Sequence, residues 1–291
     1  ALFVAYSKLV EGHGFLVALA LVGVLVAMLL APIEVLGWWA GWYGEGLSEP
    51  DTDDVGPYEE VGVSADADHY VVLLDGIAKV GHDNYENVEA LLDGLAQRKP
   101  NAVILGDVMP YSPRNLALTE GRPLAPWWRF AFRLKVEGRA PLLAFSINIR
   151  NFMQVIVAAD RRYGPIYGQG EAQSILNSLL RAGYRPDSGI PITLIGYSGG
   201  AQIAALAAPF LKRALSAPVS LISLGGVVAS ERGLLELDHF YHLQGSKDRV
   251  ATITNLFFPG RWPIFTHSYW NRVRRKGLPM SIDMGPMTHH Q

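Results

Sequence analysis

The hydrophobic positions of this chain begin as one unbroken run and then divide into short segments. Gly14 to Ile33 is a stretch of twenty residues without a charge. As a helix rising about 1.5 Å per residue it would span about 30 Å, the thickness of a bilayer's hydrocarbon core. An aromatic cluster of the kind found at membrane interfaces follows at once: Trp38, Trp39, Trp42 and Tyr43. The pattern predicts an N-terminal membrane anchor, residues 1–43, with a transmembrane helix over about residues 14–36.

A signal peptide or a buried helix would fit this apolar run less well. A cleaved signal peptide has a shorter apolar region, a basic start and a small-residue cleavage site, which are not visible here. A buried helix of this length is rarely apolar on every face. Lys8 precedes the run and no Lys or Arg follows it until Lys79, so the positive-inside rule slightly favours a single pass with the following domain on the non-cytoplasmic face.

An acidic segment, residues 44–68, separates this anchor from the rest of the chain. It combines many Asp and Glu residues with Pro50, Pro57 and several glycines. This composition predicts a solvated linker. Its D-x-D-D spacing lacks the glycine and the terminal glutamate of an EF-hand loop, so we expect no calcium site there.

Apolar, β-branched runs then alternate with helical patterns. The first two expected strands, Tyr70–Leu74 and Ala102–Gly106, flank a helix expected over Tyr85–Gln97. This rhythm predicts a mostly parallel sheet with helices on both faces, in one α/β domain over residues 69–291. Further strands are expected at Ile192–Ile195, Val219–Gly226, His239–Leu243 and Pro279–Met284, and further helices at Leu142–Ala159, Glu171–Ala182 and Ala201–Ala208.

The rhythm is interrupted over about residues 109–160, which we interpret as a cap-like insertion. Prolines break up its first part, and aromatic and basic residues then alternate over Trp127–Lys135. Such a segment suits a membrane interface, and we expect it to lie near the membrane and to cover the entrance to the site. An ordinary cap helix with a solvated basic face is the alternative. A rigid charged loop is expected over Asp160–Tyr167.

Composition excludes several classes of chemistry. The chain has 291 residues, no cysteine and a formal net charge of −2. Thiolate catalysis, disulfides and cysteine-bound zinc are therefore excluded, and general nucleic-acid binding is not expected. No P-loop, dinucleotide-binding or H-E-x-x-H motif is present. His239 and His242 are three apart on an expected strand and so point to opposite faces, which argues against a shared metal. No cofactor is implied.

One motif carries specific chemistry. Gly196-Tyr197-Ser198-Gly199-Gly200 follows an expected strand and precedes an alanine-rich helix. Strand, G-x-S-x-G and helix together are typical of a nucleophile elbow, in which a serine sits on a turn so tight that its neighbours must be small. The helix N-terminus beneath it offers free N–H groups to a developing negative charge. The alternative is a glycine-rich turn whose serine has no catalytic role.

On this elbow, and on the later loops that carry Asp248 and His289, the chain resembles the α/β-hydrolase superfamily in its membrane-associated, esterase/lipase-like branch. The resemblance covers roughly residues 70–291. It implies that the acid follows a strand after the elbow and that the histidine follows the last strand. The catalytic candidates are then Ser198 as nucleophile, His289 as general base and acid, and Asp248 as the residue that orients the imidazole.

Other residues compete for two of these roles. Glu231 is the rival acid because it follows the Gly225-Gly226 strand. His290 is the neighbour of His289, and adjacent residues cannot both face the serine. His267 is less suitable because it precedes the last expected strand.

The expected oxyanion donors are the backbone N–H groups of Ile77 and Gly199. Gly199 follows the nucleophile, and Ile77 follows the first strand of the domain. The segment Leu74-Asp75-Gly76-Ile77 departs from the fuller HGGG type found in the family. Because backbone donors need no particular side chain, position alone supports this assignment.

These features predict a membrane-anchored serine hydrolase acting on ester or lipid-like acyl substrates. A thioesterase or a peptidase would use the same residues. The alternative is a catalytically silent subunit with this fold that serves assembly or interaction in a membrane protein complex. The expected partners are membrane lipid and an acyl substrate, and not nucleic acid.

Overall fold

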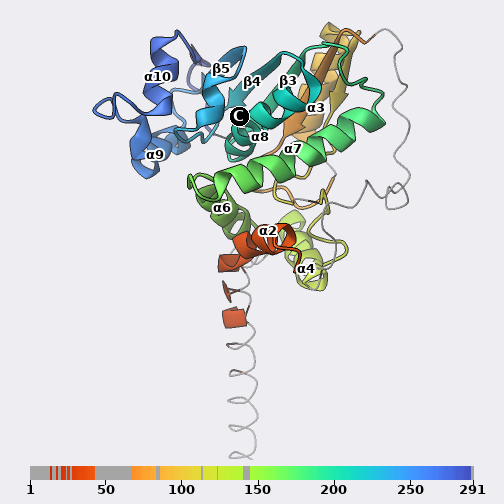
Figure 1. Ribbon diagram of the computed structural model, residues 1–291. Coiled ribbons are helices and arrows are strands. Elements are labelled where there is room, and N and C mark those ends of the chain that lie inside the picture. The colour runs from red at the N-terminus through yellow and green to blue at the C-terminus, as the bar shows by residue number, and fades with distance from the viewer. Residues whose placement is uncertain are drawn as a thin grey trace, which may run out of the picture.

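A parallel β-sheet forms the centre of the molecule (Figure 1). The structure is a computed structural model that describes residues 14, 18, 21–23, 25–26, 28–42, 67–82, 86–112, 114–122, 124–139 and 145–289. Within these residues the sheet has six strands in the order β2-β1-β3-β4-β5-β6, every pair parallel. The predicted parallel α/β architecture is confirmed. The strands are β1 (His69–Leu74), β2 (Ala102–Leu105), β3 (Ile192–Tyr197), β4 (Val219–Leu224), β5 (His239–Gln244) and β6 (Met280–Asp283).

The strand order reverses between β1 and β3. β1 pairs with β2 on one side and with β3 on the other, and the chain then continues outward through β4, β5 and β6. In open parallel sheets, ligands bind beyond the carboxyl ends of the strands at such a reversal. The segments that leave β1 and β3 are those that carry Ile77 and Ser198.

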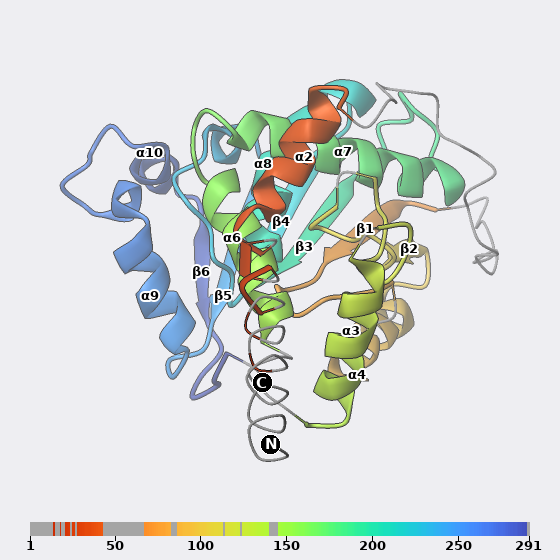
Figure 2. The same ribbon diagram turned by 90° about the horizontal axis from the view of Figure 1, so that it is seen from below.

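Helices cover both faces of the sheet and its ends. Seen from below, β6, α9 and α10 lie at one end of the molecule (Figure 2). The helices that follow β1 are α3 (Glu86–Arg98), α4 (Ala125–Val136), α6 (Ser146–Ala158), α7 (Gly164–Arg181), α8 (Gly200–Leu215), α9 (Arg249–Phe257) and α10 (Tyr269–Arg275), with 3-10 turns η1 (Arg232–Leu235) and η2 (Pro259–Arg261).

The loop expected over Asp160–Tyr167 is only partly a loop. α7 already begins at Gly164, with Pro165 in its first turn. Proline is well placed there because its fixed φ suits a helix and its missing N–H would have no partner in the helix. This proline therefore marks a helix start, where the sequence pattern had indicated a rigid connection.

The elbow helix α8 lies in the middle of the hydrophobic core. Its alanines from Ala201 to Ala208 are almost fully buried, and α7 runs along it. Small side chains allow this close approach of two helices and the sheet. The helix that begins at Gly200, two residues after Ser198, is therefore held rigidly.

A helix from the region assigned to the anchor packs on the α/β body. α2 (Ala31–Trp39) lies with α4 and α6 on the lower side of the body in Figure 1. Met28, Ala31 and Val35 are buried in the core, and the Tyr167 hydroxyl donates to the Pro32 carbonyl over 3.1 Å.

In the part of the chain that the structure describes, no helix has both the length and the hydropathy needed to cross a membrane. Part of the apolar run lies outside the described residues, as do residues 1–13, Tyr43 and linker residues 44–66. Of the aromatic cluster, Trp39 packs partly against the core and Trp42 is exposed.

Candidate active site

The turn between β3 and α8 has the strained backbone that a nucleophile elbow requires. Ser198 adopts a left-handed conformation with φ of 51°, which costs a residue with a side chain roughly 1–2 kcal/mol. The turn is fixed from both sides, since Ser198 N–H donates to Leu224 O and Val227 N–H donates to Ser198 O. A Cβ at Gly196 would overlap the Ala201 backbone, and one at Gly200 would overlap the Leu74 carbonyl. The two glycines are therefore a steric requirement of the turn.

Three side chains meet above this turn in a continuous hydrogen-bonded series. His289 Nε2 lies 2.9 Å from Ser198 Oγ, and His289 Nδ1 lies 3.0 Å from Asp248 Oδ2. Asp248 follows β5 and His289 follows β6, so both reach the edge of the sheet at which β3 delivers the serine. The structure thus brings together the three residues that the sequence pattern indicated.

The carboxylate of Asp248 is held by its own backbone surroundings. Its Oδ1 accepts a hydrogen bond from Val250 N–H at 2.8 Å, within the first turn of α9. Its Oδ2 then faces His289, and the side chain is almost fully buried. With one oxygen occupied by the backbone, the carboxylate has a fixed orientation toward the imidazole.

Tyr197 supports the histidine in a way that sequence reasoning missed. Its ring stacks on the His289 ring at a centroid distance of 5.4 Å, and its hydroxyl donates to the His289 backbone carbonyl over 2.6 Å. Burial raises the pKa of Tyr197 to about 12, so the hydroxyl keeps its proton and remains a donor. Its place beside the serine in the motif was visible, but its pairing with a residue 92 positions away was not.

The two expected oxyanion residues lie side by side. A Cβ at Gly199 would come 2.9 Å from Ile77 Cγ2 and 3.1 Å from the Tyr111 hydroxyl. Gly199 is also the N-cap residue of α8, so its N–H lies at the positive end of that helix. Convergence of the two N–H groups on a common point stays a prediction.

The rival residues lie elsewhere. Glu231 is buried and accepts a hydrogen bond from Gln202 Nε2 at 2.8 Å, and burial raises its pKa to about 7. His267 is exposed in the loop before α10, and His290 lies outside the described residues. Asp248, and not Glu231, is therefore the carboxylate that contacts His289.

Two further histidines belong to the sheet. His239 is exposed, whereas His242 is buried with Nδ1 2.9 Å from Ser223 Oγ, so the two point to opposite faces as predicted. Burial lowers the pKa of His242 to about 3, which keeps it neutral near pH 7. Among the described residues, no group of three or more His, Asp or Glu side chains is placed to hold a metal.

A cavity among the described residues is separate from the three side chains. It has a volume of about 370 Å³ and lies between β5, β6, η2 and α10. Arg261 and Trp270 form part of its wall, with the guanidinium stacked over the ring at 3.9 Å. Arg261 also donates to the Val228 carbonyl, which ties η2 to the loop after β4. These contacts give Arg261 a structural role.

The expected interface helix lies close to the site. α4 contains Trp127–Lys135, and the Lys135 ammonium donates to the Ala78 carbonyl over 3.1 Å, directly after Ile77. Trp128 is buried, whereas Leu124 and Phe130 are exposed. The segment therefore lies between the oxyanion region and the surface.

Comparison with protein-family models and with curated protein sequences finds no match to this chain. The fold alone does not decide the activity, because parallel α/β sheets carry many unrelated functions. The geometry of the site itself is what can indicate an activity.

Proposed function

We propose that this protein is a membrane-anchored serine hydrolase of the α/β-hydrolase type that cleaves ester or lipid-like acyl substrates. The observation that carries the proposal is the hydrogen-bonded series Ser198–His289–Asp248 on a strained elbow. A serine without a catalytic role gains nothing from a left-handed backbone, two glycines that the turn requires and a buried imidazole–carboxylate pair. Strain of this kind persists mainly where function selects it.

The geometry supports acyl transfer in two steps. Ser198 Oγ attacks the acyl carbonyl while His289 Nε2 takes the hydroxyl proton, and Asp248 stabilises the imidazolium that forms. The negative charge that develops on the carbonyl oxygen is stabilised by the N–H groups of Gly199 and Ile77. Collapse of the tetrahedral intermediate breaks the bond to the leaving group, which receives the proton from His289. Water, deprotonated by His289, then attacks the acyl carbonyl, and the second intermediate collapses to release the acid while His289 returns the proton to Ser198 Oγ.

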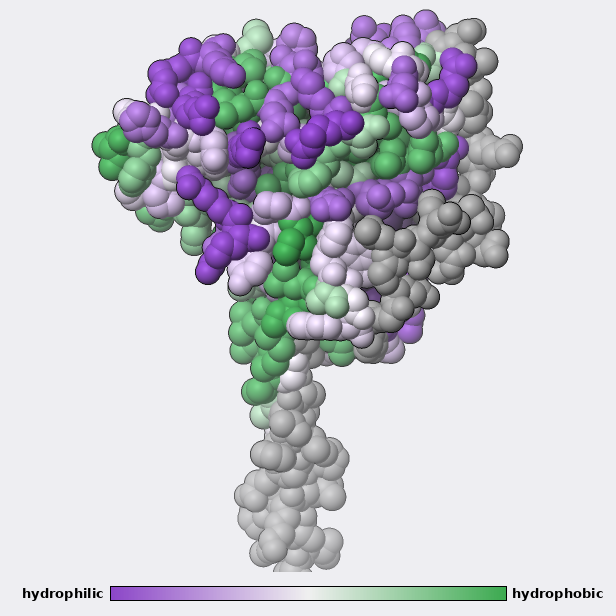
Figure 3. Space-filling view, viewed as in Figure 1, coloured by the Kyte–Doolittle hydropathy of each residue, from purple (hydrophilic) through white to green (hydrophobic). Residues whose placement is uncertain are grey.

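The proposed membrane attachment rests on the apolar N-terminal run. The described residues that precede α2 present exposed apolar side chains, among them Leu21, Leu25 and Leu29. Figure 3 shows hydrophobic surface on the lower part of the body, where α6 lies. A long apolar helix leading into the body would place α4, with its exposed Phe130, near the headgroup level.

A silent assembly subunit is the second candidate, because an apolar surface lies on and after α9. Ile253, Leu256, Phe257, Ile264 and Phe265 are all substantially exposed there. Clustered exposed apolar side chains are typical of interaction surfaces. This candidate does not require the contact between His289 and Ser198.

Labelling with a fluorophosphonate probe tests the proposal. The full chain in detergent should react with the probe and hydrolyse p-nitrophenyl esters, whereas Ser198→Ala should do neither. Ser188→Ala, in an exposed turn after α7, is the matched control and should retain both activities. A wild-type chain that folds but is not labelled and does not turn over an ester, thioester or peptide would support the assembly subunit.

A further inference from the structure

The segment that leaves β1, Asp75–Lys79, has every backbone carbonyl held by a hydrogen bond. Tyr111 Oη donates to Asp75 O over 3.1 Å, Lys79 N–H donates to Gly76 O over 3.1 Å, and Lys135 Nζ donates to Ala78 O over 3.1 Å. Asn151 Nδ2 donates to the remaining two, Ile77 O at 2.8 Å and Lys79 O at 3.0 Å. Three of these four donors come from outside the segment.

These bonds determine where the Ile77 N–H points. In a planar trans peptide the C=O of one residue and the N–H of the next point in opposite directions. The Gly76 carbonyl is turned toward Lys79 N–H, so the Ile77 N–H points away from that turn. Asn151 fixes the following peptide through the Ile77 carbonyl. Releasing Asn151 would leave the Ile77–Ala78 peptide free to rotate, and the proposed oxyanion donor would lose one of its two restraints.

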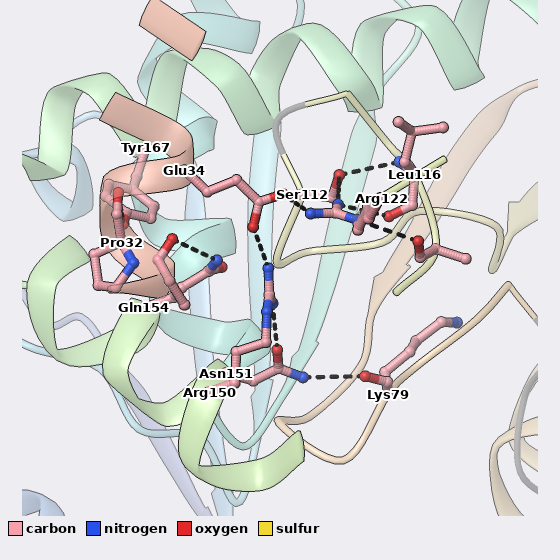
Figure 4. Close-up of polar contacts among 12 residues, drawn as sticks. Pro32, Glu34, Lys79, Ser112, Leu116, Arg122, Arg150, Asn151, Gln154 and Tyr167 are labelled. Carbon is pink, nitrogen blue, oxygen red and sulfur yellow. Dashed lines mark hydrogen bonds and ion pairs between the residues drawn. The ribbon is translucent and has the colours of Figure 1, made fainter. Parts of the chain in front are cut away.

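Asn151 is itself oriented by Arg150, which in turn pairs with a glutamate on α2. Its Oδ1 accepts a hydrogen bond from Arg150 at 2.9 Å, and Arg150 donates in turn to Glu34 Oε2 at 2.7 Å. Figure 4 shows Glu34 reaching from α2 toward Arg150, with Asn151 extending onward to the Lys79 backbone. Arg150 and Asn151 are both almost fully buried. A buried guanidinium depends strongly on its counter-charge.

Glu34 also makes a second ion pair, which does not lead to the Asp75–Lys79 segment. Its other oxygen, Oε1, pairs with Arg122, which donates to Ser112 Oγ and to the carbonyls of Leu116 and Ala117. Those acceptors belong to the loop before α4. Loss of Arg122 would therefore weaken the contact of α2 without touching Asn151.

We propose that Glu34, Arg150 and Asn151 form a relay that positions the oxyanion segment, so that the ion pair between Glu34 of α2 and Arg150 controls catalytic efficiency. The relay rests on the proposed hydrolase function. It links the helix that continues the apolar N-terminal run to the backbone beside Ser198. All three are positioning residues, since their hydrogen bonds lead to the backbone of residues 77–79 and not to the reacting side chains.

Variants of the full chain in detergent, assayed with p-nitrophenyl butyrate, test the relay. Asn151→Ala should lower kcat about tenfold with KM within about twofold, because a displaced donor weakens the transition state more than the ground state. Arg150→Gln and the milder Glu34→Gln should lower kcat in the same way. Adding Glu34→Gln to Asn151→Ala should cause no further loss, since residues of one relay are not additive.

Arg122→Gln is the matched control. It removes the other ion pair of Glu34 and should lower the unfolding temperature without lowering kcat. An equal loss of kcat in Arg122→Gln and Arg150→Gln would overturn the relay, as would an unchanged kcat in Asn151→Ala.

Amide hydrogen exchange separates the relay from the hydrolase proposal. Exchange over residues 76–79 should become faster in Asn151→Ala and Arg150→Gln and stay unchanged in Arg122→Gln, even if wild type hydrolyses no substrate. Absence of activity in wild type would refute the hydrolase. Unchanged exchange in Asn151→Ala would refute the relay.

Discussion

The Tyr197 ring stacks on His289, and the Tyr197 hydroxyl donates to the His289 backbone carbonyl over 2.6 Å. The histidine is thus held at its ring by one set of contacts and at its backbone by another. Both residues are part of the candidate site, although Tyr197 has no role in proton transfer. Tyr197, the motif residue that precedes the nucleophile, therefore positions His289, the candidate base.

Tyr197→Phe tests this role. The variant keeps the stacked ring and loses one hydrogen bond, worth about 1 kcal/mol. We expect kcat/KM for a p-nitrophenyl ester to fall about fivefold. Tyr184→Phe is the control, because it removes a similar hydroxyl-to-carbonyl bond, to Ile190 O, away from the site. Equal effects of the two changes would mean that Tyr197 acts only through stability.

Gly225→Ala should separate the acid from the base. A Cβ there would lie 3.0 Å from Asp248 Oδ2 and 3.2 Å from His289 Nδ1, at a φ of 51°. We expect at least a tenfold loss of turnover and a loss of about 1 kcal/mol in the free energy of unfolding. Gly189→Ala has a similar backbone cost, with φ of 70° and open space around the new methyl. It should lose stability and keep full turnover.

Asp248→Asn should test whether the carboxylate orients the imidazole. The amide has the same shape, but it can offer an N–H to Nδ1 and so favour the wrong tautomer of His289. Replacing the acid in this manner costs a serine protease on the order of 10⁴ in kcat. We expect kcat for ester turnover to fall at least a hundredfold. Circular dichroism should show that the fold is retained. Near-normal turnover would point to another acid.

Glu231 predicts a pH dependence of stability. Burial raises its pKa from 4.5 to about 7, so the folded protein binds a proton that the unfolded chain has already released between these values. Its stabilising effect is complete below about pH 4.5 and is lost as pH rises through 7. The loss is on the order of 3 kcal/mol, at about 1.4 kcal/mol per pKa unit.

The variant Glu231→Gln mimics the protonated acid and keeps an acceptor for Gln202. Denaturant unfolding should show it close to wild type at pH 5 and more stable at pH 8. The exposed Glu120→Gln should leave the pH dependence unchanged. Parallel curves for wild type and Glu231→Gln would contradict the raised pKa.

The sequence predicted best what is encoded locally. Strand runs such as Tyr70–Leu74 and the elbow at Ser198 depend on neighbouring residues, and both were found where they were expected. The choice of Asp248 and His289 followed from the order of serine, acid and histidine that the resemblance to the α/β-hydrolase superfamily implied.

What the sequence did not predict depends on contacts between distant segments. Glu34 looked like the first charge after an apolar run, and only the folded body shows the two arginines that it pairs with. Tyr197 looked like a variable residue of the motif. Pro165 was interpreted as part of a rigid loop, because a proline alone does not distinguish a helix start from a turn.

The strand that precedes the histidine, β6, is the least protected of the described sheet. All four residues of β6 are exposed, and in the described part of the chain it pairs only with β5. Such edges open by local unfolding at a lower free energy than the whole domain. Each opening would carry His289 away from Ser198 while the buried core stayed folded. Thermal inactivation should therefore begin below the temperature of global unfolding and reverse fully on cooling.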